Sequence, residues 1–350
     1  MTKYNSSDSK CLILDVRSIT HLIYMSSVFE DRIFHVNTIL IWKGKASTLK
    51  LAEKFFTMPK NCYILDINIQ DSKLIFNPKA ISKIKKLCKK INNKYKYIEL
   101  SSSFASGFYF ELLKHYLGAK DESIIQFDDG LINELKEPNR YRAIKFIIYA
   151  IHGMFHFPSR YKLFSDIRFK KIYSSIKPNN IDAIDNKAVH DISHIVSKKI
   201  STISLKNISI INSRSAILMT THSVESDRMT TPEYQKMIKN VFNKLKDNGV
   251  TDIYLSSHPA EKNSNNNFYR DLGMNLTFQY YPSELLVANK NITSFASPMN
   301  STILLSHHLK LLDSIELIIA YIPNKSPYVK MVMKLISNIL SKYPLTYYVL

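Results

Sequence analysis

The stretch Ser123-Ile124-Ile125-Gln126-Phe127-Asp128-Asp129-Gly130 joins an apolar run to an acidic pair and a glycine. The apolar run predicts a short buried strand, and Gly130 lets the chain turn as it leaves the strand. Open α/β sheets place their chemistry at the carboxyl ends of their strands. Asp128 and Asp129 are therefore candidate functional carboxylates, although acidic residues before a glycine also form ordinary turns.

A second strand end carries a histidine. The apolar run Asp252-Ile253-Tyr254-Leu255 is followed shortly by His258-Pro259. A carboxylate and a histidine at two facing strand ends would supply a base and an acid on either side of a cleft. A lone His-Pro pair more often lies in an ordinary loop. Other parts of the sequence are needed to choose between a catalytic histidine and such a loop.

Strand-like and helix-like segments alternate along most of the chain, which predicts parallel sheets covered by helices. Residues 131–175 differ, because they are basic and aromatic and indicate helix, and residues 176–213 are polar. The expected strands are 11–16, one within 34–42, 62–67, 97–100, 123–127, 215–221, 251–257, 275–281, 292–295 and 315–321. The expected helices are 19–30, 78–93, 104–117, 232–248, 282–288 and 327–341.

This pattern predicts an α/β protein with two Rossmann-like domains. The first spans residues 1–175, a linker region spans 176–213, and the second domain spans 214–350 and closes with a helix. Two such domains facing a central cleft form the GT-B arrangement of many glycosyltransferases, although the pattern also fits other two-domain α/β proteins.

The charge of the chain favours an anionic partner. There are 48 Lys and Arg residues against 29 Asp and Glu, for a formal net charge of +19. Such a balance suits nucleic acid, an anionic lipid surface or an acidic sugar or nucleotide. Basic residues cluster in 79–96, 140–171 and 330–342, and aromatic residues interleave with the middle cluster, as expected of a peripheral membrane segment. A solvated basic face is an equally good interpretation.

The expected location is the cytoplasm, with peripheral contact to the inner membrane as an option. Three widely spaced cysteines indicate a reducing compartment without disulfides or a zinc motif. The polar N-terminus lacks the apolar core of a signal peptide, and no apolar run is long enough to span a membrane. No helix-turn-helix, RRM or OB pattern is present, so we do not expect nucleic acid as a partner.

Two downstream segments complete a candidate site. Tyr281-Pro282-Ser283-Glu284 places Glu284 in the first turn of an expected helix, where it could simply complement the helix dipole. Ser301-Thr302 places two hydroxyls at another expected helix start, which suits either an anion site or an ordinary N-cap.

The ordered set of motifs resembles bacterial GT-B sialyltransferases, including the polysialyltransferase-like group. These carry a D/E-D/E-G motif, an HP motif, a ribose-binding glutamate and paired hydroxyl residues on the phosphate. The matching residues here are Asp128-Asp129-Gly130, His258-Pro259, Glu284 and Ser301-Thr302, where the family commonly has Ser-Ser in the last motif.

The resemblance implies an inverting transfer of sialic acid from CMP-sialic acid, without cofactor or metal. Asp128 would be the base on the acceptor, with Asp129 as the runner-up. His258 would protonate or hydrogen-bond the departing phosphate, Ser301 and Thr302 would hold it, and Glu284 would bind the ribose.

The expected acceptor is a terminal sugar, galactose first, on a bacterial lipopolysaccharide, lipooligosaccharide, O-antigen or capsule chain. The alternatives are a polysialyltransferase, a transferase for another CMP-activated acid such as Kdo, or a non-enzymatic module that binds polyanions.

Overall fold

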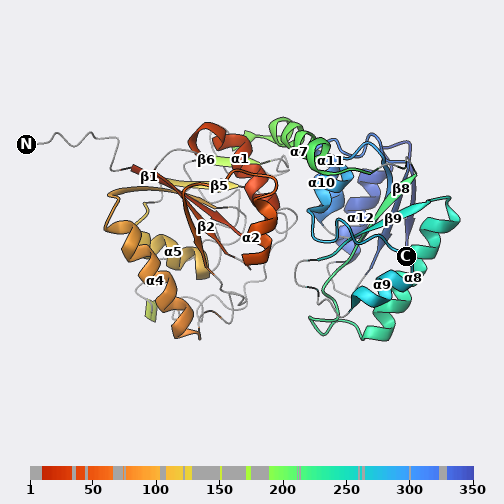
Figure 1. Cartoon of the computed structure of the whole chain (residues 1–350), viewed down its shortest axis with the longest axis horizontal. Helices are drawn as coiled ribbons and strands as arrows, with labels where there is room; N and C mark the ends of the chain where they lie inside the picture. The colour runs from red at the N-terminus through yellow and green to blue at the C-terminus, as the bar shows by residue number, and fades with distance from the viewer. Residues whose placement is uncertain are drawn as a thin grey trace, which may run out of the picture. The chain divides into compact units, whose positions relative to one another are not determined.

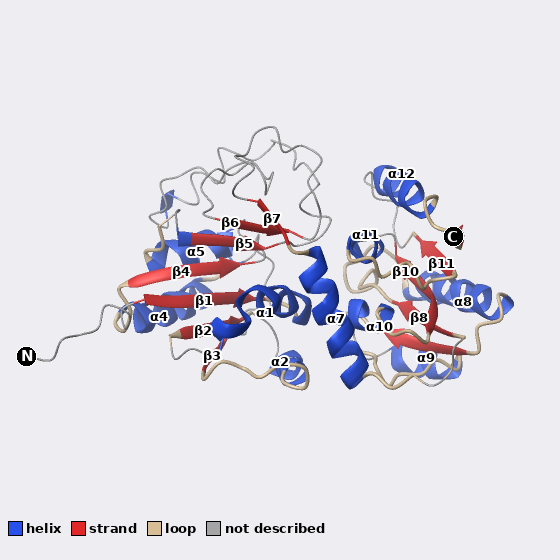
Figure 2. Ribbon diagram, turned by 90° about the horizontal axis from the view of Figure 1, so that it is seen from above, coloured by secondary structure: helices blue, strands red, loops and turns tan. Residues whose placement is uncertain are grey.

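The computed structural model divides the chain into two compact units, Met1–Val196 and Ser197–Leu350. It describes residues 10–33, 37–43, 46–65, 74, 76–102, 108–120, 123–127, 150–151, 171–174, 189–210, 212, 214–258, 261, 265–298, 301–322 and 329–350. Each unit contains one parallel sheet with helices on both faces (Figures 1 and 2).

The sheet of the first unit has the strand order β3-β2-β1-β4-β5-β6-β7, and every described pair of neighbouring strands is parallel. The chain adds β2 and β3 on one side of β1 and the later strands on the other, so the order reverses between β1 and β4. The strands are β1 (Lys10–Val16), β2 (Thr38–Trp42), β3 (Asn61–Ile64), β4 (Tyr97–Ser102), β5 (Ile124–Phe127), β6 (Lys171–Ser174) and β7 (Val189–Asp191).

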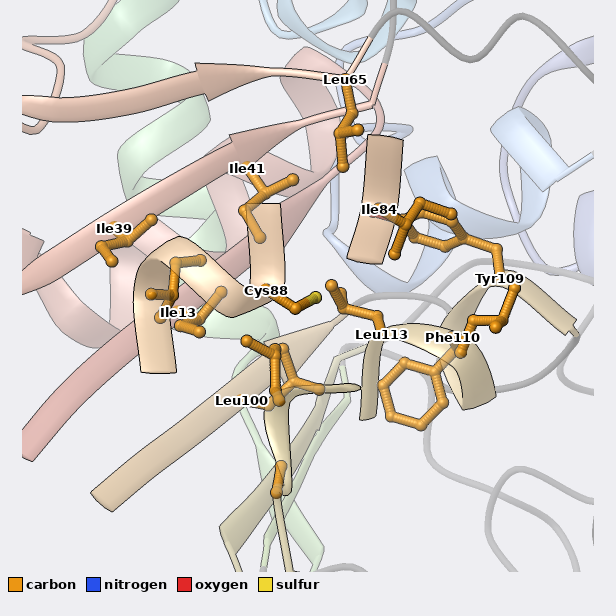
Figure 3. Close-up of a cluster of buried hydrophobic side chains, with 14 of the residues drawn as sticks. Ile13, Ile39, Ile41, Leu65, Ile84, Cys88, Leu100, Tyr109, Phe110 and Leu113 are labelled. Carbon is orange, nitrogen blue, oxygen red and sulfur yellow. The ribbon is translucent and has the colours of Figure 1, made fainter. Parts of the chain in front are cut away.

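Helices cover both faces of this sheet (Figure 2). The kinked helix α1 (Ile19–Ile33) lies on one face, while α4 (Pro78–Asn92) and α5 (Phe108–Leu117) lie on the other. The short helix α2 (Ala46–Ala52) follows β2. Figure 3 shows how side chains from β1, β2 and β4 interleave with those of α4 and α5 in a closely packed apolar cluster.

The second unit repeats the design with the strand order β12-β11-β10-β8-β9, again all parallel. Here the order reverses between β8 and β10. Its strands are β8 (Ser215–Met219), β9 (Asp252–Ser256), β10 (Ile292–Pro298), β11 (Leu317–Tyr321) and β12 (Thr346–Val349).

The helices of the second unit also occupy two layers (Figure 1). Helices α8 (Thr231–Asp247) and α9 (Asn266–Asp271) pack on one face. Helices α10 (Ser283–Val287), α11 (Ser301–His308) and α12 (Val329–Leu340) lie on the other. Helix α7 (Ser193–Asn207) begins in the first unit and runs into the second.

Helix α8 illustrates how capping residues determine where a helix begins and ends. Thr230 accepts a hydrogen bond from the Glu233 N–H, the Glu233 carboxylate accepts one from the Thr230 N–H, and Pro232 occupies the first turn. This capping box satisfies backbone N–H groups that have no partner within the helix. Gly249, with a φ of 81°, then ends the helix in a conformation that other residues adopt poorly.

The alternating α/β pattern is confirmed, but some segments differ from the expectation. The expected strand 275–281 is wrong: Asn275 forms one bridge to Tyr254, and its side chain then accepts the Thr277 N–H at 2.9 Å. That hydrogen bond makes a turn where apolar periodicity suggested a strand. The helical interpretation of 131–175 is wrong for 171–174, which form β6, while most of that stretch lies outside the described residues. The structure also adds β12.

The polar stretch 176–213, expected to be a linker, contains β7 and the whole of α7. The three-residue β7 is too short to show a periodic pattern, and the sequence of α7 has no clear apolar stripe, so composition alone predicted an interdomain linker.

Candidate functional site

The candidate residues of the second unit lie at the carboxyl edge of its sheet. His258 follows β9, Thr220 and His222 follow β8, and α11 begins after β10. Because all these strands are parallel, their carboxyl ends lie on one edge. The reversal of strand order between β8 and β10 marks the position where open α/β sheets bind their ligands.

His258 lies against the end of β8. Its backbone N–H donates to the Thr220 hydroxyl at 3.1 Å. Its ring stacks on the ring of His222, with centroids 4.3 Å apart and planes inclined by 28°. The structure therefore brings together two imidazoles from two neighbouring strand ends.

Both imidazoles are held in their neutral form. Burial, with the second imidazole as a smaller cause, lowers the pKa of His258 from 6.5 to about 4, and Glu225 partly opposes this. Burial and the charge of Arg228 lower the pKa of His222, again against Glu225. A neutral imidazole can donate one N–H hydrogen bond, and it becomes a proton donor only when a nearby anion favours its charged form.

A half-buried carboxylate, that of Glu261, supports this strand end. Glu261 accepts hydrogen bonds from the Thr220 hydroxyl, from the Tyr269 hydroxyl and, at 3.2 Å, from the amide of Asn265. Burial raises the pKa of Glu261, while these donors act in the opposite direction. Since Thr220 also accepts the His258 N–H, Glu261 positions the histidine backbone through Thr220.

Two tyrosines extend this network into α8 and α9. The hydroxyls of Tyr234 and Tyr269 lie 3.3 Å apart, and the Tyr234 hydroxyl accepts the Thr221 N–H at 3.4 Å. Burial is the main reason that the pKa of each phenol is raised, so both keep their protons. These hydrogen bonds link the ends of β8 and β9 to helices α8 and α9.

Glu284 lies in the first turn of α10 and is 8% exposed. Two hydrogen bonds hold the segment before α10 against the end of β9. The Ser257 N–H donates to the Gln279 carbonyl at 2.6 Å, and the Ser256 hydroxyl donates to the Tyr281 carbonyl at 3.4 Å. The first turn of α10, which contains Glu284, therefore lies beside the end of β9.

Helix α11 begins at Ser301, three residues after β10 ends at Pro298. Thr302 is 7% exposed, and the Ser297 hydroxyl donates to the Pro298 carbonyl at 2.9 Å. The first N–H groups of a helix favour an anion. The expected helix start at Ser301-Thr302 is therefore present on the same edge as His258.

The remaining predicted site residues, Asp128, Asp129, Gly130 and Pro259, lie outside the described residues. Asp128 directly follows β5, which is the strand expected there. Within the part of the chain that the structure describes, no group of three His, Cys, Asp or Glu side chains could hold a metal ion.

The sequence alone did not reveal the bracing network. Glu261 stands three residues after His258, and this short spacing was a usable signal. Tyr234 and Tyr269 stand on amphipathic helices, where an aromatic residue normally indicates core packing, so nothing in the pattern separated them from other buried tyrosines.

Comparison with solved structures identifies the fold. The chain aligns with an α/β-galactoside α-2,3-sialyltransferase from Photobacterium phosphoreum at a TM-score of 0.52 and 10% identity, covering 97% of this chain and 98% of that one. It also aligns with UDP-GlcNAc 2-epimerases from Methanocaldococcus jannaschii (TM-score 0.51, 11% identity, 93% and 86% covered) and Neisseria meningitidis (0.51, 12%, 93% and 85%). The fold is of the GT-B type.

At these identities the likeness concerns the GT-B fold and not the reaction. No protein-family model matches the chain, and no curated protein matches it by sequence. Among the described residues, no helix is both long and apolar enough to cross a membrane.

Proposed function

We propose that the chain is an inverting glycosyltransferase that moves sialic acid from CMP-sialic acid to a terminal sugar of a bacterial surface glycan. The proposal rests on the position and surroundings of His258. This half-buried imidazole follows β9, stacks on His222 and shares one sheet edge with the first turns of α10 and α11. That edge offers a proton donor, an anion-binding helix start and a carboxylate for hydroxyl groups.

His258 acts on the leaving phosphate. In the free protein its low pKa keeps it neutral, but a bound phosphate favours the charged form and raises the pKa. Donor binding therefore prepares the imidazole to give a hydrogen bond or a proton to CMP as the glycosidic bond breaks. General acid catalysis of this kind contributes roughly 10²–10⁴-fold to a rate.

The starts of α10 and α11 bind the nucleotide. The first N–H groups of α11, with the hydroxyls of Ser301 and Thr302, hold the phosphate. Glu284 accepts hydrogen bonds from the ribose hydroxyls. Because protein groups supply this stabilisation, the reaction as proposed needs no metal.

The acceptor is activated by a carboxylate of the first unit. The resemblance assigns this role to Asp128, with Asp129 as the alternative, in the motif that Gly130 completes. Removing a proton from the acceptor hydroxyl as the anomeric carbon is attacked gives a single displacement and inverts the configuration. Pro259 completes the His-Pro motif.

The setting is the inner face of a bacterial membrane, where chains of lipopolysaccharide or capsule are built. Helix α4 supports this with a row of exposed lysines that includes Lys79, Lys83, Lys86 and Lys90. Such a face attracts anionic lipid headgroups.

The experiment measures CMP release from CMP-sialic acid with lactose as the acceptor, and identifies the product by mass. Asp128→Ala and His258→Ala should each lose at least about 100-fold in kcat, while the exposed His194→Ala serves as a control for the loss of a histidine. Product length distinguishes single transfer from polysialylation, and CMP-Kdo and UDP-GlcNAc are run as competing substrates. Turnover of UDP-GlcNAc alone, or full activity in both variants, contradicts the proposal.

A further inference from the structure

The second imidazole of the pair, that of His222, follows the strand that borders the reversal of strand order in the second sheet. The order β10-β8-β9 places the end of β8 between the end of β10, where α11 begins, and the end of β9, which His258 follows. Ligands of open α/β sheets bind where the strand order reverses, which here lies between β10 and β8. An anion at the first turn of α11 therefore has the end of β8 as its nearest neighbouring strand end.

The loop that carries His222 is a compact turn closed by its own backbone hydrogen bonds. The Ser226 N–H donates to the His222 carbonyl at 3.0 Å, and the Arg228 N–H donates to the Ser223 carbonyl at 2.8 Å. The hydroxyls of Thr221 and Ser223, on either side of His222 in the chain, lie 3.2 Å apart. These contacts fix the backbone of His222 at the carboxyl edge of the sheet.

The two nitrogens of the His222 ring differ in their surroundings. Among the residues that the structure describes, none donates to or accepts from its Nδ1 atom, which is buried. Because His222 as a whole is half-buried, Nε2 is the nitrogen that a ligand can reach. A neutral imidazole carries its proton on one nitrogen, and a buried N–H without an acceptor is unfavourable. His222 therefore holds its proton on Nε2 and offers one N–H donor at this edge.

Charged neighbours of the pair come from two segments. Glu225 and Arg228 lie on the loop after β8, where the charge of Glu225 raises the pKa of both imidazoles and that of Arg228 lowers the pKa of His222. Glu261 follows β9 and is one hydrogen-bonded side chain away from the His258 backbone. Burial is the largest cause acting on both imidazoles, so both rings are neutral in the free protein.

The stack of the two rings divides their roles. The centroids of His222 and His258 lie 4.3 Å apart, and two like charges at this separation repel each other, so the pair takes up one proton rather than two. Charging His222 would place an N–H on its buried Nδ1 atom, for which no described residue is an acceptor. The proton that a bound anion attracts therefore goes to His258.

We propose that His222 is a second imidazole on the leaving phosphate, where its Nε2–H donates to a phosphate oxygen while the stacked His258 carries the proton. The inference deepens the proposed function, on which it rests only for the identity of the anion as the phosphate of a CMP-sugar. When the bond between the anomeric carbon and the phosphate oxygen breaks, its electron pair goes to that oxygen, and His258 gives its proton to the phosphate. The acceptor oxygen bonds to the anomeric carbon, and its proton passes to the carboxylate of the first unit.

Calorimetry on the full chain compares CMP with cytidine, because the two ligands differ only in the phosphate. His222→Phe keeps a ring for stacking but has no N–H, so it should lower the preference for CMP about tenfold, as expected for one hydrogen bond to a charged group. His222→Gln, whose amide N–H reaches the place of Nε2, should retain most of the preference. His194→Phe, which removes an exposed histidine of α7, should leave it unchanged, and thermal melting reports folding.

An unchanged preference in His222→Phe, or equal losses in the phenylalanine and glutamine variants, overturns the role of His222. Histidine-labelled wild-type chain titrated with inorganic sulfate gives a test that needs neither a folded His222→Phe nor CMP. In ¹H–¹⁵N spectra the Nε2 signal of His222 should shift together with that of His258, and a shift confined to His258 overturns the inference. A sulfate response at His222 without any binding of CMP refutes the CMP-sugar function but supports the anion site, so the two failures are distinguishable.

Discussion

The imidazole of His258 should titrate far below an ordinary histidine, and a second imidazole should be part of the reason. Burial and His222 together lower its pKa from 6.5 to about 4. At pH 7 only about one molecule in a thousand then carries the charged form in the free protein. The perturbation that tests this is His222→Phe, which keeps an aromatic ring for stacking and removes the second titrating group.

The shift has a definite sign and size. A histidine whose folded pKa is lowered contributes full stability above its unfolded pKa of 6.5, and this contribution is lost as the pH falls from 6.5 towards 4. The complete loss amounts to at most about 3 kcal/mol, since one pKa unit is worth 1.36 kcal/mol. In His222→Phe the pKa of His258 should rise but stay below 6.5, because burial is the larger cause.

Long-range ¹H–¹⁵N spectra of histidine-labelled protein measure this pKa directly, with His258→Gln to assign the signal. His194→Phe, which replaces an exposed histidine of α7, is the matched control. Adding CMP should raise the pKa of His258, since a phosphate favours the imidazolium. A pKa of 6.5 or more in the free protein, or no rise in His222→Phe, would show that burial and His222 do not hold His258 neutral.

Four further predictions follow from the geometry. Glu261→Gln leaves one buried hydroxyl without a hydrogen-bond acceptor, which should destabilise the second unit by about 1–3 kcal/mol. It should also lower kcat without raising the KM for the acceptor sugar. Unchanged chemical denaturation and kinetics would contradict this prediction. Thr220→Val should lose kcat while Thr220→Ser retains it, because only the hydroxyl accepts the His258 N–H; equal rates would remove Thr220 from the network. Thr230→Ala should cost about 1 kcal/mol by removing the cap of α8, read from hydrogen exchange of that helix, with no change expected in α12. Co-sedimentation with anionic vesicles should be strong at low salt and weak at high salt, and absence of binding at low salt would exclude the membrane setting.

Short apolar runs bounded by turn residues were enough to predict the central strands. The run before Asp128 is β5 and the run before His258 is β9, and both lie in parallel sheets as alternation with helices requires. Periodicity was misleading around Asn275, where a side chain that accepts the Thr277 N–H closes a turn. A local hydrogen bond of this kind leaves no trace in the pattern of apolar residues.

Candidate site residues were visible only where a motif marked them. His258 and Glu284 could be proposed from their order in the chain, whereas Glu261 acts through a fold-dependent contact with Thr220. The same holds for the stacking of His222 on His258, which depends on β8 and β9 being neighbours in the sheet. Side chains that act by holding others in place become apparent only when the strands are assembled.

We propose that the edge around His258 binds CMP and releases it during sugar transfer. The most direct measurement incubates the full chain with CMP-sialic acid and 3′-sialyllactose or lactose, and follows the mass of the glycan and the release of CMP together. We predict that one acceptor gains a sialic acid for each CMP released, and that His258→Ala abolishes both signals in a folded protein. Glycan mass unchanged under all conditions, with CMP-sialic acid intact, would contradict the account.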